Sequence, residues 1–139
     1  MKSDTEERVL EKYPRDVKLV FKNYPLRNHK FVRPAAIAAL AAGKQGRFWE
    51  FHDLLFKNYS RLTAQKINEI ARQLDLNMVQ FEKDQKDSRI QDQVARDLSD
   101  GAKVSVRGTP TVFINGRLLR NRDLTGFQRL IEKVMEKQP

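Results

Sequence analysis

The chain has 139 residues, a length that accommodates one domain and is short for two. It contains no cysteine, so a disulfide framework, a thiolate metal site and a thiol nucleophile are excluded. The net charge is +9, but the basic residues alternate with Asp and Glu along most of the sequence. We therefore expect a basic, solubilising surface, and we keep a basic nucleic-acid-binding module as the weakest functional alternative.

Composition also argues against a membrane span, a metal site and a cofactor. No apolar run approaches the roughly 18 residues that cross a bilayer, because the longest, 35–42, is flanked by Arg33 and Lys44. His29 and His52 are too far apart in the sequence to indicate a zinc site. No glycine-rich phosphate loop or serine nucleophile motif occurs. We expect no metal and no cofactor.

The first elements are a helix and a strand. Ser3 and Glu6 have the spacing of a capping box, which predicts a helix from the N-terminus to about Tyr13, where Pro14 ends it. Residues 17–23 alternate apolar and polar side chains, which predicts a strand that Tyr24-Pro25 ends.

A helical block follows, in which apolar residues recur at helical spacing. The predicted helices cover 31–42, 48–56, 64–74 with Thr63 as N-cap, 77–81, and 84–99 with Gly101 as the end signal. The aromatic segment 48–56 predicts a buried face, so we interpret His52 as a structural histidine and Trp49 as a core residue. His29 is expected to be solvated.

The pattern then changes to that of a hairpin and a last helix. Residues 111–114 predict a strand, Asn115-Gly116 is the strongest two-residue hairpin signal, and 117–119 predict the return strand. A final helix is predicted from about Leu124, with Phe127 and Ile131 on its apolar side. The predicted order is α, β, a helical block, β, β, α.

Three pieces of this sequence carry a family resemblance. They are 17–26, then 35–40 with 48–56, and finally Val106-Arg107-Gly108-Thr109-Pro110-Thr111-Val112-Phe113-Ile114-Asn115-Gly116. In this order and spacing, the pieces resemble the DsbA-like family of thiol–disulfide oxidoreductases. The resemblance implies an α/β thioredoxin-like fold with an inserted helical subdomain. The predicted division is one incomplete domain, with thioredoxin core elements in 1–26 and 104–139 and the helical insertion in 27–103.

The chain departs from the family at its start. In the family, a first strand leads into a Cys-x-x-Cys motif at the beginning of the helix that precedes the strand corresponding to 17–23. Here Met1 already stands in that helix, so the first strand and the motif are both missing, as expected of an N-terminally truncated member. The family is extracytoplasmic, but this chain carries no signal peptide, and its localisation stays unknown.

The resemblance also marks a candidate substrate-binding site at Gly108, Thr109, Pro110 and Thr111. Thr109-Pro110 corresponds to the family's cis-proline loop, in which the backbone before proline binds extended polypeptides. A tight turn holds a cis bond before proline at small cost, and we expect a cis bond here. The alternative is a proline that only fixes φ where a strand begins. No residue of this chain is expected to be catalytic.

The missing strand has a structural consequence. In the thioredoxin arrangement it lies between the strands 17–23 and 111–114, and without it both strands expose backbone groups near the core. Each buried group without a partner costs roughly 1–3 kcal/mol, so these edges must be paired or covered. We expect a homodimer that forms through the exposed strand edges.

Several functions stay open. The first is a DsbA-like thioredoxin-fold domain, related to thiol–disulfide oxidoreductases and isomerases, that has no redox activity because it lacks a thiol. The second is a non-catalytic peptide-binding or chaperone-like module that uses 108–111. A cysteine-free enzyme on the same scaffold, like the related glutathione-dependent isomerases, would need an N-terminal active-site residue that is also absent.

Overall fold

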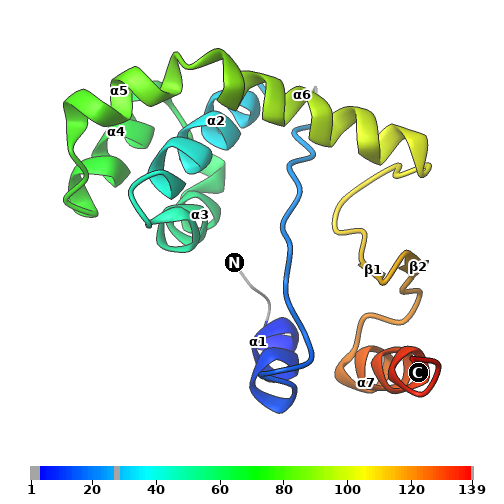
Figure 1. Ribbon diagram of the computed structural model, residues 1–139. Helices are drawn as coiled ribbons and strands as arrows, with labels where there is room; N and C mark the ends of the chain where they lie inside the picture. Colours follow the sequence, from blue (N-terminus) through cyan, green and yellow to red (C-terminus); the bar gives the residue numbers. More distant parts are fainter. Residues whose placement is uncertain (1–3, 27–28, 139) are drawn as a thin grey trace. The chain divides into compact units, whose positions relative to one another are not determined.

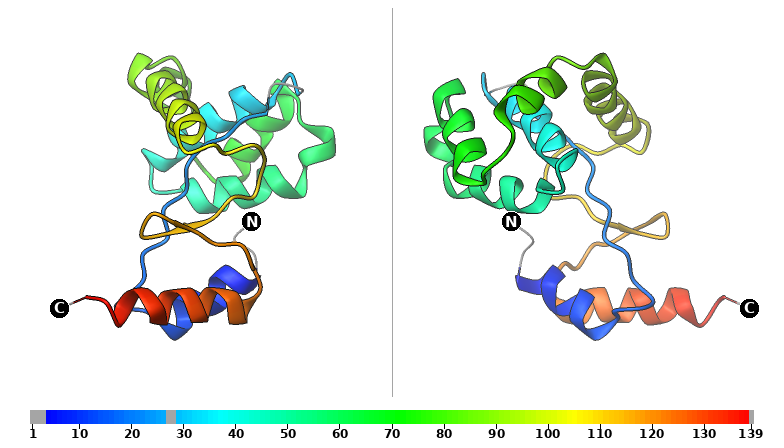
Figure 2. Two further views of the ribbon diagram at one scale, coloured as in Figure 1. Left: turned by 90° about the vertical axis from the view of Figure 1, so that its right-hand side faces the viewer. Right: turned by 60° about the vertical axis from the view of Figure 1, so that its left-hand side comes forward.

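The computed structural model describes residues 4–26 and 29–138, and these form two compact units. One unit, Lys22–Ser105, is helical. The other combines Lys2–Phe21 with Val106–Pro139 and holds a hairpin between two helices. Figures 1 and 2 show the elements of each unit. We call them the helical unit and the hairpin unit. None of the helices in the described part of the chain is both long and apolar enough to cross a membrane.

The helical unit is organised around an alanine-rich helix. Its elements are α2 Val32–Gly43, α3 Phe48–Lys57, the short 3₁₀ helix Tyr59–Arg61, α4 Ala64–Gln73, α5 Met78–Gln85 and α6 Ser88–Lys103. Ala38, Ala41 and Ala42 of α2 are fully buried, and their small side chains let α3, α4, α5 and α6 all approach this helix. Phe51 of α3 and Phe81 of α5 fill the core, with ring centroids 5.7 Å apart.

Side-chain caps fix where these helices begin. Thr63 accepts a hydrogen bond from the backbone N–H of Lys66, 3.0 Å away, as its N-cap position predicted. Asn77 caps α5 in the same way, and its own backbone exchanges two hydrogen bonds with the side-chain amide of Gln45. Asp87 caps α6 by accepting from the backbone N–H of Arg89. These residues satisfy backbone donors that the first turn of each helix leaves open.

A buried carboxylate ties α6 to the start of the helical unit. Asp97 is 4% exposed, and its Oδ2 accepts from the backbone N–H of Asn23 at 2.9 Å and from the Asn23 Nδ2 at 3.0 Å. Its Oδ1 accepts from the Gln93 Nε2 at 2.8 Å and lies 3.9 Å from the Lys22 ammonium. Both oxygens therefore have partners, which is the condition for burying a carboxylate. We call this arrangement the Asp97 clasp.

The hairpin unit packs its two helices together beneath the hairpin. Its elements are α1 Asp4–Lys12, β1 Phe113–Ile114, β2 Arg117–Leu118 and α7 Leu124–Met135. Val9 of α1 and Phe127 and Ile131 of α7 are buried in one cluster with Leu119, and α1 and α7 lie side by side in Figures 1 and 2. The Tyr13 hydroxyl donates to the Glu132 carboxylate at 3.0 Å, which links the end of α1 to α7.

The strand predicted at 17–23 is not formed. The segment has no regular secondary structure, and Val20 and Phe21 are 64% and 40% exposed. An alternating pattern marks residues that suit a strand, but a strand exists only where a neighbour shares a backbone ladder. The described structure contains one sheet, formed by β1 and β2, and 17–23 has no part in it. The expected homodimer through exposed strand edges stays a prediction.

Several helices begin or end a few residues away from the positions predicted from the sequence. The helix predicted to end at Gly101 continues to Lys103, because the left-handed residue that ends it is Ser105, with φ 61°. The helix predicted at 77–81 continues to Gln85, and α6 begins at Ser88 rather than at 84. The capping residue predicted at Ser3 lies outside the described residues. The division into a core and a 27–103 insertion stays a prediction.

Candidate functional site

The four residues marked from the sequence form one exposed turn in front of β1. The Thr109-Pro110 peptide bond is cis, and Thr109, Pro110 and Thr111 are exposed while Gly108 is half-buried. The Thr111 hydroxyl donates to the Gly108 carbonyl at 2.7 Å and closes the turn. The structure therefore brings Gly108, Thr109, Pro110 and Thr111 together. We call this turn the 108–111 loop.

Arg122 also contacts the 108–111 loop, although the sequence did not mark it as a residue of this site. Arg122 stands just before α7, and its guanidinium Nη1 donates a hydrogen bond to the carbonyl oxygen of Pro110. A hydrogen bond from a charged donor is stronger than one between neutral groups. In the sequence, Arg122 is one of three closely spaced arginines, with Arg117 and Arg120, and no spacing rule connects residues 110 and 122. Their proximity follows from the hairpin that lies between them.

The hairpin has the geometry that its turn sequence predicted. Asn115 and Gly116 both have positive φ, 46° and 78°, as a type I′ turn requires. Phe113 is paired with Leu118, and Ile114 with Arg117. The strands are shorter than predicted, but a further hydrogen bond from the Leu119 N–H to the Val112 carbonyl, 2.9 Å, continues the pairing toward the 108–111 loop.

The start of α7 fixes the chain that follows the hairpin. Asp123 is the N-cap, and its carboxylate accepts from the Gly126 N–H at 2.7 Å. A Cβ at position 126 would lie 2.0 Å from the carbonyl oxygen of Asn121, so only glycine fits. This close approach places Arg122 immediately before the helix, within reach of the loop.

The groups of the 108–111 loop can bind but cannot react. Its hydroxyls and its backbone N–H and carbonyl groups can exchange hydrogen bonds with an extended chain. The loop carries no titratable side chain and no nucleophile of the kind that thiol chemistry needs. Over the described residues, no three His, Asp or Glu side chains gather as a metal site.

The two histidines lie in the helical unit. His52 is 6% exposed and stands among aromatic rings, with the Phe56 ring centroid 4.6 Å and the Trp49 ring centroid 5.6 Å away. Its Nδ1 lies 3.3 Å from the Asp53 carboxylate. His29 is exposed and meets the Tyr59 ring edge-on. His52 is therefore buried and His29 exposed, as expected, and the structural role of His52 stays a prediction. Trp49, expected in the core, is only half-buried and is not part of the core cluster.

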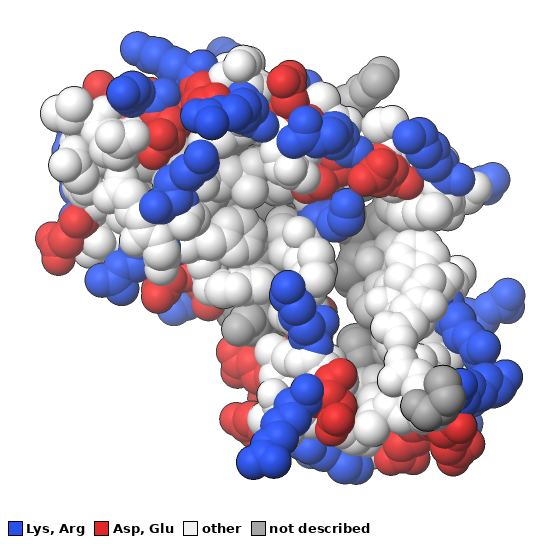
Figure 3. All heavy atoms as spheres, viewed as in Figure 1, with Lys and Arg blue, Asp and Glu red and all other residues white. Residues whose placement is uncertain are grey.

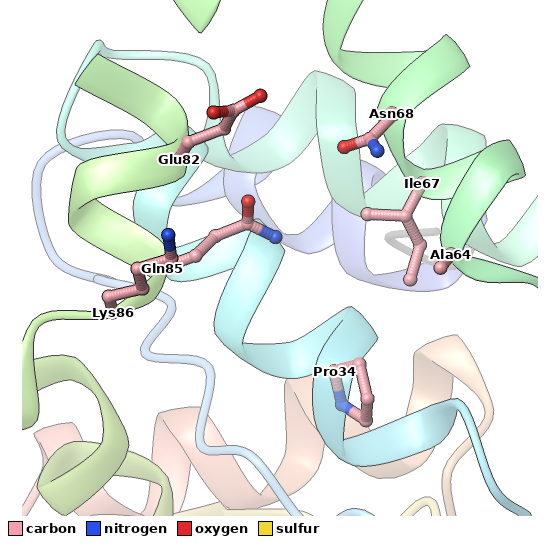
Figure 4. Close-up of a pocket in the computed structure, with 7 residues that line it drawn as sticks. All are labelled: Pro34, Ala64, Ile67, Asn68, Glu82, Gln85 and Lys86. Carbon is pink, nitrogen blue, oxygen red and sulfur yellow. The ribbon is translucent and has the colours of Figure 1, made fainter. Parts of the chain in front are cut away.

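The helical unit also contains an open pocket of about 320 Å³, shown in Figure 4. It is lined by residues of α2, α4 and α5 and by the residue after α5, namely Pro34, Ala64, Ile67, Asn68, Glu82, Gln85 and Lys86. One acid, one base and two amides do not form a reactive set, because no acid–base pair or nucleophile is aligned there. The pocket carries no functional assignment.

Comparison with known proteins places this arrangement in a family. A family model described as "Thioredoxin" matches residues 1–133, and the chain belongs to this family, in its DsbA-like branch. The fold is thioredoxin-like with a large helical part. A solved thioredoxin-like oxidoreductase from Silicibacter pomeroyi DSS-3 superimposes with a TM-score of 0.78 at 22% identity, covering 96% of this chain and 77% of that one. At this identity the likeness concerns the fold alone.

Two curated relatives each contain a region that is similar in sequence to this chain. The "Probable disulfide bond formation protein D" of Bacillus anthracis is 30% identical over 132 residues, which are 87% of this chain and 59% of that protein. The "Na(+)/H(+) antiporter NhaA 3" of Salinispora tropica is 39% identical over 102 residues, 73% of this chain and 16% of the antiporter. The chain thus spans less than two thirds of the length of either relative.

Proposed function

We propose that this chain is the cysteine-free scaffold of a DsbA-like thiol–disulfide oxidoreductase, and that it performs no disulfide exchange by itself. The observation that carries the proposal is the family match over 1–133 in a chain with no cysteine. Disulfide exchange begins with thiolate attack on sulfur, so the chain lacks the attacking group. The name of the Bacillus anthracis relative, a probable disulfide bond formation protein, supports the assignment to disulfide chemistry.

In this proposal the 108–111 loop is the wall that a polypeptide substrate would contact. Two hydrogen bonds support this role, from Thr111 to Gly108 within the loop and from Arg122 to Pro110 across it. A loop held from both sides keeps its exposed backbone groups in a fixed position, which lowers the entropic cost of binding. Thiols would come from a segment with the family's strand and Cys-x-x-Cys motif.

The proposal is tested by insulin reduction with dithiothreitol as the reductant. The chain alone should give the uncatalysed rate. A fusion that adds a strand and a Cys-x-x-Cys turn ahead of residue 1 should accelerate the reaction. The same fusion with both cysteines changed to serine is the control and should return to the uncatalysed rate.

The outcomes separate the two parts of the proposal. Acceleration by the chain alone would show that it does not need a thiol, and the assignment would be wrong. A folded fusion that is no faster than its serine control would show that the scaffold no longer supports thiol chemistry. Circular dichroism of the fusion establishes that it is folded.

A further inference from the structure

The pocket shown in Figure 4 holds no reactive set, but its lining has the groups that bind a small molecule. All seven lining residues lie within Lys22–Ser105, and the helices that carry them, α2, α4 and α5, pack directly on one another. The apolar part consists of Pro34, Ala64 and Ile67, and Ile67 belongs to the buried core. The shape of the pocket therefore depends on packing inside the helical unit.

Two side-chain amides face each other across this pocket. In Figure 4, Asn68 points into the pocket from α4, and Gln85 points into it from α5. Both residues are half-buried, and neither side chain forms a hydrogen bond with another residue in the described part of the chain. Each amide offers two donors and one acceptor, and a polar group that is partly removed from water gains from a hydrogen-bonding ligand. The pair therefore favours a polar ligand over a purely apolar one.

An acid and a base line the same pocket one helical turn apart. Glu82 lies in α5 and Lys86 is its C-cap with helical backbone angles, a spacing at which Cβ atoms are about 5–6 Å apart. Neither side chain forms an ion pair with another described residue. Many lysine and arginine side chains lie beside aspartate or glutamate instead, as Figure 3 shows for one face of the molecule. Glu82 and Lys86 can therefore offer one negative and one positive group to the same small ligand.

We propose that this pocket binds a free α-amino acid with an apolar side chain. Such a zwitterion carries an ammonium and a carboxylate group on the same carbon atom, and these match Glu82 and Lys86. Its apolar side chain would cover Ile67, while its polar groups would exchange hydrogen bonds with Asn68 and Gln85. A purely anionic or purely cationic ligand would leave one of the two charged side chains unmatched. The inference does not depend on the proposed function, because no thiol takes part.

Binding is measured by NMR titration of the isotope-labelled full chain with L-leucine at neutral pH. The backbone amide signals of 64–68 and 82–86 should shift together and saturate. The dissociation constant should lie in the millimolar range, because exposed ion pairs contribute little. Two analogues separate the charges, since 4-methylpentanoate lacks the ammonium group and 3-methylbutylamine lacks the carboxylate group. Each analogue should bind roughly fivefold more weakly than L-leucine.

Two substitutions, each with a matched control, locate the site. Lys86→Gln should weaken binding of L-leucine roughly fivefold, whereas Lys83→Gln, the same charge change on α5 outside the pocket lining, should leave it unchanged. Glu82→Gln should also weaken binding, whereas Glu11→Gln, in α1 of the hairpin unit, should not. All four positions are exposed, so the variants should fold, and circular dichroism checks that they do.

Several results would overturn the proposal. A titration without saturable shifts would show that the pocket takes no free amino acid, and shifts that leave out 64–68 and 82–86 would place the binding elsewhere. If 4-methylpentanoate or 3-methylbutylamine binds as tightly as L-leucine, the pocket does not recognise a zwitterion. Equal effects of Lys86→Gln and Lys83→Gln would show that only the net charge of the chain matters.

Discussion

The Asp97 clasp predicts a large loss of stability from a single substitution. In Asp97→Ala, the backbone N–H and the Nδ2 of Asn23 both lose their acceptor, and Asn23 is only 5% exposed. A buried donor without a partner costs about 1–3 kcal/mol, so two such donors give a loss of about 2–6 kcal/mol in the free energy of unfolding. The free energy of unfolding of ordinary domains is about 5–15 kcal/mol, so the substitution would remove a substantial fraction of the stability.

The assay is urea unfolding followed by tryptophan fluorescence. Trp49, the single tryptophan, lies in α3 and therefore reports on the helical unit that contains the clasp. Asp92→Ala is the control, because Asp92 lies on the same helix but is exposed, and it should change stability by no more than about 0.5 kcal/mol. Asp97→Asn keeps one carbonyl oxygen as an acceptor, so its loss of stability should lie between those of Asp97→Ala and Asp92→Ala. Equal midpoints for Asp97→Ala and Asp92→Ala would refute the reasoning.

Two further substitutions test the hairpin unit by circular dichroism. Gly126→Ala should lower the free energy of unfolding by about 1–3 kcal/mol, because the new Cβ would meet the backbone of Asn121, and this outweighs the helix preference of alanine. Gly108→Ala is the control: it has open space around its Cβ and should leave the stability nearly unchanged. A neutral Gly126→Ala would contradict the close approach. Tyr13→Phe removes the hydrogen bond to Glu132 and should cost about 1 kcal/mol at neutral pH. Burial and the Glu132 carboxylate raise the pKa of Tyr13 above its usual 10.0, so its contribution is complete below pH 10.0 and falls as the pH rises through the folded pKa. The wild type should therefore lose more stability than Tyr13→Phe above pH 10.0, and parallel pH profiles would contradict this.

The sequence determined most helices and the hairpin because these depend on neighbouring residues. Thr63 and Asn77 are caps that act within their own first turn, and Asn115-Gly116 supplies the two positive φ values of its turn without help from the rest of the chain. The family resemblance rested on such local pieces in a fixed order, and the family match confirms it. The 108–111 loop was located on the same basis.

Contacts between residues that are far apart in the sequence were decided by the tertiary structure alone. The strand predicted at 17–23 has a local pattern but needs a ladder partner, and the pattern cannot report whether a partner is present. The pairing of Asp97 with Asn23 and of Arg122 with Pro110 follows from chain paths that no spacing rule encodes. Local order is set by backbone and side-chain preferences over a few residues, whereas these contacts form only when distant segments are brought together by packing.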